Sequence, residues 1–187
     1  MKRLIRSSDS VDFNMSSNDI LKNLKLLDAK LRENDMLGEV DLYGGAVMCL
    51  GLNARQSTHD IDAVFSPKSD IYQLIREVAY ENGLPEDWMN DSVKGFVSDN
   101  GEFIRFGENE FTNLTVMMTS PEYLFAMKCL SCRLTDESST ELKDIAFLAD
   151  YLEIKSVQEA EDIILEYYPA SRYKPKTHYM LVELFES

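Results

Sequence analysis

Two aspartates one residue apart, Asp60 and Asp62, are the side chains in this sequence best suited to chemistry. They follow Thr58 and stand among apolar residues, a pattern that predicts a β-strand. Alternate side chains of a strand point to one face, so the two carboxylates would share a face with Cα atoms roughly 6.5–7 Å apart. Carboxylates this close repel each other, and a divalent cation that prefers oxygen ligands, Mg²⁺ or Mn²⁺, removes the repulsion.

Gly44 and Gly45 precede the acidic pair, between a short run of alternating apolar residues that begins at Val40 and an apolar segment over 46–52. The pattern predicts a strand, a tight glycine turn and a short helix. Because glycine has no Cβ, its backbone N–H can approach a phosphate closely, here at a helix start whose dipole favours an anion. A phosphate site beside a metal-binding acidic pair is the equipment for phosphoryl or nucleotidyl transfer.

This order of Gly-Gly after a strand, a short helix and then Ser/Thr-x-Asp-hydrophobic-Asp resembles the signature of the nucleotidyltransferase superfamily with the DNA polymerase β-like fold. The resemblance implies that the acidic pair holds the metal ion and that Gly44 and Gly45 hold the triphosphate. Thr58 or Ser57 would donate a hydroxyl to a phosphate, although either hydroxyl also suits an ordinary turn. Fourteen residues separate Gly45 from Asp60, slightly more than in the family pattern, so we expect a longer connecting turn.

The second half of the chain carries further motifs of this kind. Lys128 and Arg133, with four residues between them, are similar to the K-x4-R motif of bacterial abortive-infection nucleotidyltransferase toxins. Asp144 and Asp150, with five residues between them, are similar to the D-x5-D motif of the same toxins. The resemblance implies that Lys128 and Arg133 contact the triphosphate and that Asp144 orients it or acts as a base. Rotations of roughly 500° and 600° along an ideal helix place neither Arg133 nor Asp150 beside its partner.

Two other tracts extend the resemblance, which covers most of residues 40–150. Residues 120–128 and 84–91 are similar to segments of small uncharacterised bacterial nucleotidyltransferase-like proteins. One departure concerns the third carboxylate that polymerase β-like enzymes usually carry on a neighbouring strand, because residues 114–118 contain none. Either Asp144 substitutes for it, or the metal site is incomplete and the protein is a poor enzyme.

Charge narrows the range of partners. The 187 residues include 33 acidic and 19 basic ones, a net charge of −14. Extended binding to duplex nucleic acid is not expected, because such proteins carry basic patches for the phosphates. A nucleoside triphosphate with Mg²⁺ or a basic protein partner fits this charge better. A small basic patch that binds an RNA end is also compatible with the sequence. The sequence has neither an apolar run of membrane-spanning length nor a secretory signal, so we expect a cytoplasmic protein without a membrane segment.

The three cysteines, Cys49, Cys129 and Cys132, agree with a reducing compartment because their number is odd. The Cys129-x-x-Cys132 spacing would suit a zinc or redox pair. However, it lies in an apolar helical run without a second pair, so we interpret all three as core residues.

The remaining pattern predicts an α+β protein with a mixed polymerase β-like sheet and flanking helices in residues 1–119, followed by a helical region, 120–187, packed on this core. Residues 1–15 are expected to be a loosely docked lead-in. Helices are expected after the capping residues Ser16 or Ser17, Ser120 and Ser156, and over 71–79 and 142–152.

The sequence thus predicts a Mg²⁺-dependent nucleotidyltransferase that moves a nucleoside monophosphate from an NTP to an acceptor hydroxyl on an RNA end, a protein or a small molecule. By resemblance, its setting would be a toxin–antitoxin or phage-defence module. A first alternative is a catalytically weak or inactive binding module, antitoxin-like, whose acidic surface binds a basic partner. A second is an antibiotic-modifying nucleotidyltransferase, because an acidic site attracts a cationic acceptor.

Overall fold

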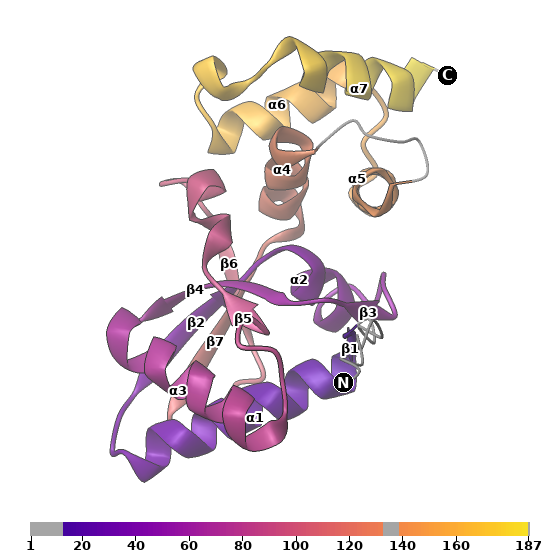
Figure 1. Cartoon of the computed structure of the whole chain (residues 1–187). Coiled ribbons are helices and arrows are strands. Elements are labelled where there is room, and N and C mark those ends of the chain that lie inside the picture. Colours follow the sequence, from indigo (N-terminus) through magenta and orange to yellow (C-terminus); the bar gives the residue numbers. More distant parts are fainter. Residues whose placement is uncertain (1–12, 133–138, 187) are drawn as a thin grey trace, which may run out of the picture.

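A five-stranded mixed sheet forms the centre of the molecule in the order β5-β4-β2-β7-β6, in a computed structural model that describes residues 13–132 and 139–186 (Figure 1). The central strand β2 runs antiparallel to β4 and parallel to β7. The expected α+β class is confirmed. The strands of this sheet are β2 (Gly38–Leu42), β4 (Ile61–Ser66), β5 (Met89–Asn90), β6 (Phe103–Phe106) and β7 (Leu114–Thr119).

Helices lie on both sides of this sheet. Figure 1 shows α1 and α3 together below the strands and α4 to α7 grouped above them. Two short strands, β1 (Met15–Ser16) and β3 (Ser57–Thr58), pair separately beside α2. The helices are α1 (Ser17–Glu33), α2 (Gly44–Leu50), α3 (Lys68–Asn82), α4 (Pro121–Ser131), α5 (Thr140–Tyr151), α6 (Val157–Tyr167) and α7 (Pro175–Glu186), with short 3₁₀ turns η1 (Ser92–Phe96) and η2 (Ala170–Arg172).

The two faces of the sheet differ in burial. Alternate side chains of the central strands, such as Val40 on β2 and Ala63 on β4, are fully buried toward α1 and α3. At the start of β2 the packing is so close that a Cβ on Gly38 would lie 2.8 Å from Ile71 Cδ1 and 2.9 Å from Leu31 Cδ1. The opposite face carries the intervening, partly exposed side chains, among them Asp62. This second face is where a ligand can reach the sheet.

Helix starts follow the capping residues that the sequence indicates. The Ser16 hydroxyl accepts a hydrogen bond from a first-turn N–H of α1, and the Ser156 hydroxyl does the same for α6. Ser120 caps α4, with Pro121 at its first position. These three predicted helix starts are confirmed.

Other local predictions are wrong. Residues 1–12 of the expected loosely docked lead-in lie outside the described residues, but Met15 at its end is buried in the strand that pairs with β3 at Thr58. The strand expected to carry both aspartates begins at Ile61, so Asp60 lies in the bend before it. The Thr58 hydroxyl donates to the Asp60 carbonyl at 3.2 Å and closes this bend, which keeps Asp60 out of the ladder. The glycine turn also belongs to the helix, because α2 begins at Gly44 itself.

No helix within residues 13–132 and 139–186 combines the length and the apolar composition needed to span a membrane.

One buried carboxylate fixes the start of β7. Asp28 on α1 accepts hydrogen bonds through Oδ1 from the backbone N–H groups of Thr112, Asn113 and Leu114, at 3.0, 2.7 and 2.7 Å. We expect Asp28→Ala to lower the free energy of unfolding by about 3 kcal/mol, because it leaves buried N–H donors without an acceptor. Urea titration measures this loss. The exposed Glu33→Ala on the same helix should stay within about 0.5 kcal/mol of wild type, and an equally small loss for Asp28→Ala would contradict the assignment.

Candidate functional site

The glycine turn and the acidic pair are in direct contact. Gly44 has φ of +58°, a conformation that side chains other than glycine rarely adopt. A Cβ at this position would lie 2.9 Å from Oδ2 of Asp62. The backbone of the turn therefore lies against the carboxylate, and any residue larger than glycine would push the two apart.

Gly45 has an equally close neighbour. A Cβ there would overlap the hydroxyl of Thr58 and would lie 3.1 Å from Nη1 of Arg55. Thr58 is buried, whereas its neighbour Ser57 is partly exposed. Successive residues of a strand point to opposite sides, so only the hydroxyl of Thr58 lies against the glycine turn. The sequence left open which of the two hydroxyls would bind phosphate, and the packing places Thr58 at the turn.

Neighbouring polar side chains hold the acidic pair in place. Asn90 of the edge strand β5 donates from Nδ2 to Oδ2 of Asp60 at 2.8 Å. Ser92, two residues later, donates its hydroxyl to Oδ1 of Asp62 at 3.3 Å and also contacts Oδ1 of Asn90. Asn90 belongs to the 84–91 tract, and Ser92 follows it. The end of this tract forms strand β5, which pairs Asn90 with Asp62 of β4.

The electrostatics of Asp62 match a cation site. Burial raises the pKa of its carboxyl, and the nearby negative charge of Asp60 raises the pKa further. The Ser92 hydroxyl and the positive charge of Lys128 act in the opposite direction. A bound divalent cation would relieve the repulsion between the two carboxylates, so the residues present fit Mg²⁺.

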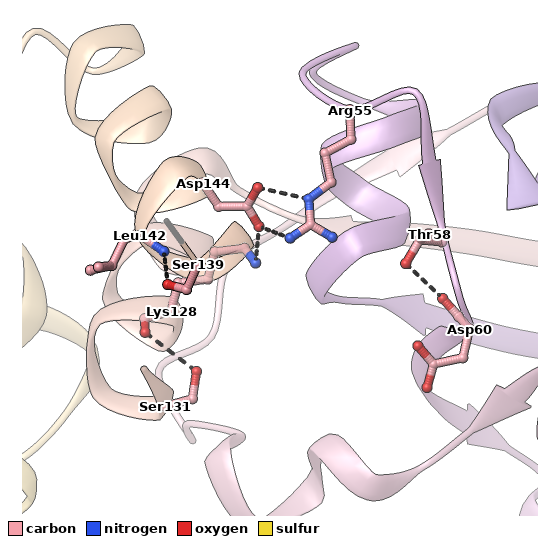
Figure 2. A network of polar contacts seen from close by, with 8 residues as sticks. All are labelled: Arg55, Thr58, Asp60, Lys128, Ser131, Ser139, Leu142 and Asp144. Atoms are coloured by element: carbon pink, nitrogen blue, oxygen red, sulfur yellow. Dashed lines mark hydrogen bonds and ion pairs between the residues drawn. The ribbon is translucent and has the colours of Figure 1, made fainter. Parts of the chain in front are cut away.

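Asp144 occupies a buried ion cluster with two cations (Figure 2). Arg55 binds it through two hydrogen bonds, from Nε to Oδ1 at 2.7 Å and from Nη2 to Oδ2 at 2.5 Å. Lys128 donates from Nζ to Oδ2 at 2.6 Å. The cluster thus joins the loop after α2, helix α4 and helix α5. Because the charge of Lys128 also acts on Asp62, the cluster and the acidic pair are neighbours within one site.

Other predicted residues lie elsewhere. Asp150 is exposed on α5, on a different face from the buried Asp144, as the helical rotation indicates. Arg133 lies outside the described residues. Cys129 in α4, Cys132 at its end and Cys49 in α2 are all buried, so the interpretation as core residues is confirmed.

Asp41 on β2 is an acidic residue of this face that the sequence reasoning missed. It pairs in register with Val64 of β4, and the N–H of Tyr43 donates to the Asp62 carbonyl at 2.9 Å. Asp41 and Asp62 are therefore diagonal neighbours on one face, a relation that separates Cα atoms by roughly 7–8 Å. Burial, followed by the charge of Glu39, raises the pKa of Asp41 to about 6.

The sequence did contain signals for the missed residues. Asp41 lies between Val40 and Leu42 in the strand that leads to the glycines, and this alternation indicates that its side chain points to the more exposed face of the strand. Arg55 is the only lysine or arginine between Gly45 and Asp60. Either signal can be interpreted only when the strand pairing and the positions of the helices are known, and the sequence alone does not give them.

The acidic residues do not form a complete protein cage for a metal. Among residues 13–132 and 139–186, no group of three or more carboxylate, histidine or cysteine ligands is placed to hold an ion. This agrees with Mg²⁺, which usually binds through one or two carboxylates together with substrate phosphates and water. Asp60 and Asp62 are the candidates for direct ligands.

Comparisons with protein-family models, curated proteins and solved structures found no match for this chain. The resemblance to the nucleotidyltransferase superfamily therefore stays an expectation drawn from the motifs.

Proposed function

We propose that this chain has a polymerase β-like nucleotidyltransferase fold and transfers a nucleoside monophosphate from an NTP to an acceptor hydroxyl, with Mg²⁺ or Mn²⁺. The observation that carries the proposal is the contact between Gly44 and Asp62. It joins a glycine turn that can approach phosphates to a carboxylate pair that can hold a divalent cation. The pairing of β2 with β4 and β7 supports the proposal, because it presents both features on the open face of the sheet.

Each residue of the site has one task in this reaction. Asp60 and Asp62 hold the cation, and hydrogen bonds from Asn90 and Ser92 orient their carboxylates. When bound, Mg²⁺ supplies positive charge to the phosphate oxygens. The backbone of the glycine turn and the Thr58 hydroxyl bind the β- and γ-phosphates. Lys128 neutralises negative charge as pyrophosphate leaves.

Asp41 takes the role of the base. The acceptor oxygen forms a bond to the α-phosphorus, the bond from that phosphorus to pyrophosphate breaks, and the hydroxyl proton passes to the Asp41 carboxylate. Asp41 suits this step because it lies on the same face as Asp62 and has a raised pKa of about 6, near neutral pH. This role was first expected of Asp144. Both carboxylate oxygens of Asp144 already accept hydrogen bonds from Arg55 or Lys128, so Asp144 is engaged in the ion cluster.

Transfer of label from each NTP tests the proposal. The protein is incubated with one α-³²P-labelled NTP at a time, Mg²⁺ and a bacterial lysate, and labelled RNA, protein and small molecules are separated. We expect one NTP to label one acceptor class, and EDTA to prevent it. Labelled RNA or protein would agree with the toxin–antitoxin or phage-defence setting, and a labelled cationic small molecule with antibiotic modification.

A second outcome would favour the binding module. NTP binding without label transfer, under conditions in which Mg²⁺ and Mn²⁺ are both supplied, would mean that the fold has kept its nucleotide site and lost the reaction. The incomplete set of metal ligands among the described residues is the observation that favours the binding module. An absence of NTP binding would overturn the nucleotidyltransferase proposal itself.

A further inference from the structure

The guanidinium of Arg55 connects the buried ion cluster to the glycine turn. We propose that Arg55 binds the triphosphate and that Asp144 is a positioning residue, which holds Arg55 and Lys128 together at the phosphate site. This inference rests on the proposed function and adds Arg55, which the family motifs do not assign. The ligand of the site is then a nucleoside triphosphate, and Arg55 makes the site bind a triphosphate more tightly than a nucleoside.

The geometry divides the donors of Arg55 into two sets. Nε and Nη2 form the paired hydrogen bonds to Asp144, so their direction is fixed. Nη1 lies on the other side of the guanidinium, 3.1 Å from where a Cβ on Gly45 would be. The hydroxyl of Thr58 lines the same space. Arg55 thus presents N–H donors beside the backbone and the hydroxyl that are proposed to bind phosphate.

Burial explains why the guanidinium is held so firmly. The side chains of Arg55, Lys128 and Asp144 are 20%, 12% and 4% exposed. In such surroundings a carboxylate with two hydrogen-bonded cations is strongly favoured over an unpaired charge. The planar fork of arginine matches a carboxylate with two parallel bonds, which the single ammonium of a lysine does not reproduce.

Among the described residues, the cluster itself holds two cations against one carboxylate. Lys128 is also close enough to act on Asp62. A triphosphate bound at the glycine turn would place further negative charge beside these two cations. Asp144 accordingly helps to bind the phosphates without touching them, by fixing the two cations that do.

Affinities for triphosphate and nucleoside distinguish this role from a structural one. The probes are ATP, GTP, CTP and UTP with Mg²⁺, followed by the diphosphate and nucleoside of the tightest binder, measured by isothermal titration calorimetry. We expect Arg55→Ala to weaken triphosphate binding 10–100-fold and to leave nucleoside binding within about twofold. Arg55→Lys should restore only part of the loss, because it cannot keep both bonds to Asp144.

The role of Asp144 has its own signature. Asp144→Asn should weaken triphosphate binding, and the double variant Arg55→Ala with Asp144→Asn should lose less affinity than the two single losses added together, because Asp144 acts in part through Arg55. Arg76→Ala is the matched control, since Arg76 is exposed on α3 with a 3.8 Å contact to Glu86, and it should bind like wild type.

Other outcomes would overturn the inference. If Arg55→Ala folds and binds triphosphate as tightly as wild type, or loses triphosphate and nucleoside affinity equally, Arg55 has only a structural role. If Arg55→Ala does not fold, Arg55→Gln, which retains most of the volume and some hydrogen bonding, replaces it under the same criteria. Wild-type protein that binds none of the four NTPs would overturn the proposed function as well, so the two failures are distinguishable.

Discussion

Replacing both Asp60 and Asp62 with asparagine is expected to abolish the thermal stabilisation that Mg²⁺ and NTP together give the wild-type protein. A ligand that binds only the folded state at 100 times its Kd stabilises it by about 2.7 kcal/mol. For a domain of this size, that corresponds to a rise in Tm of about 5–10 °C. Without carboxylates the cation loses its protein ligands, so the double variant should show almost no rise.

The fold should survive this double substitution. Asp62 lies against Gly44, and its ionised form is disfavoured by burial and by the charge of Asp60. Asparagine has nearly the same size and removes the repulsion, so Tm without ligand should not fall. Asp70→Asn with Asp162→Asn, two exposed aspartates on α3 and α6, is the control for a change of two charges. If Mg²⁺ and NTP raise the Tm of the Asp60/Asp62 variant as much as that of the wild type, these residues are excluded as the metal site.

Local signals explain how much of this fold the sequence predicts. Ser16, Ser120 and Ser156 precede apolar residues at helical spacing, and each caps a helix in the structure. Such signals act within a few residues of each other, so neither strand pairing nor tertiary contact is needed to recognise them.

The missed parts of the site depend on contacts between distant residues. Arg55 and Asp144 are 89 positions apart, and their bonds follow from the way α5 packs beside the loop after α2. The position of Asp41 beside Asp62 depends on the register of β2 against β4, and a shift of one residue would turn Asp41 to the buried face. Asp60 left the predicted strand because of a turn with Thr58. In each case the sequence shows the residue type, and the tertiary fold decides what it contacts.

Asp41→Asn is expected to slow nucleotide transfer by about 10²–10⁴-fold, the usual contribution of a general base. Triphosphate affinity should change little, because Asp41 acts on the acceptor hydroxyl and not on the phosphates. Single-turnover rates and Kd values for the NTP measure the two effects separately. Asp70→Asn is the control, since Asp70 is exposed on α3, and this variant should remain active. Unchanged transfer by Asp41→Asn would remove Asp41 from the mechanism.

The same substitution should stabilise the folded protein at alkaline pH. The pKa of Asp41 is raised to about 6 in the folded state, against about 3.9 in an unfolded chain. Folding therefore favours the protonated carboxyl, and this contribution is complete below about pH 4 and is lost as the pH rises through 6. Asparagine stays neutral, so the gain over wild type should be near zero at pH 4 and about 1–2 kcal/mol at pH 8, after allowance for solvent at this partly exposed side chain. Urea unfolding at both pH values measures this difference. A gain in the free energy of unfolding that does not depend on pH would mean that Asp41 is not the titrating group. A variant that is more stable at pH 8 and also transfers the nucleotide more slowly would show that the destabilising carboxylate is kept for catalysis.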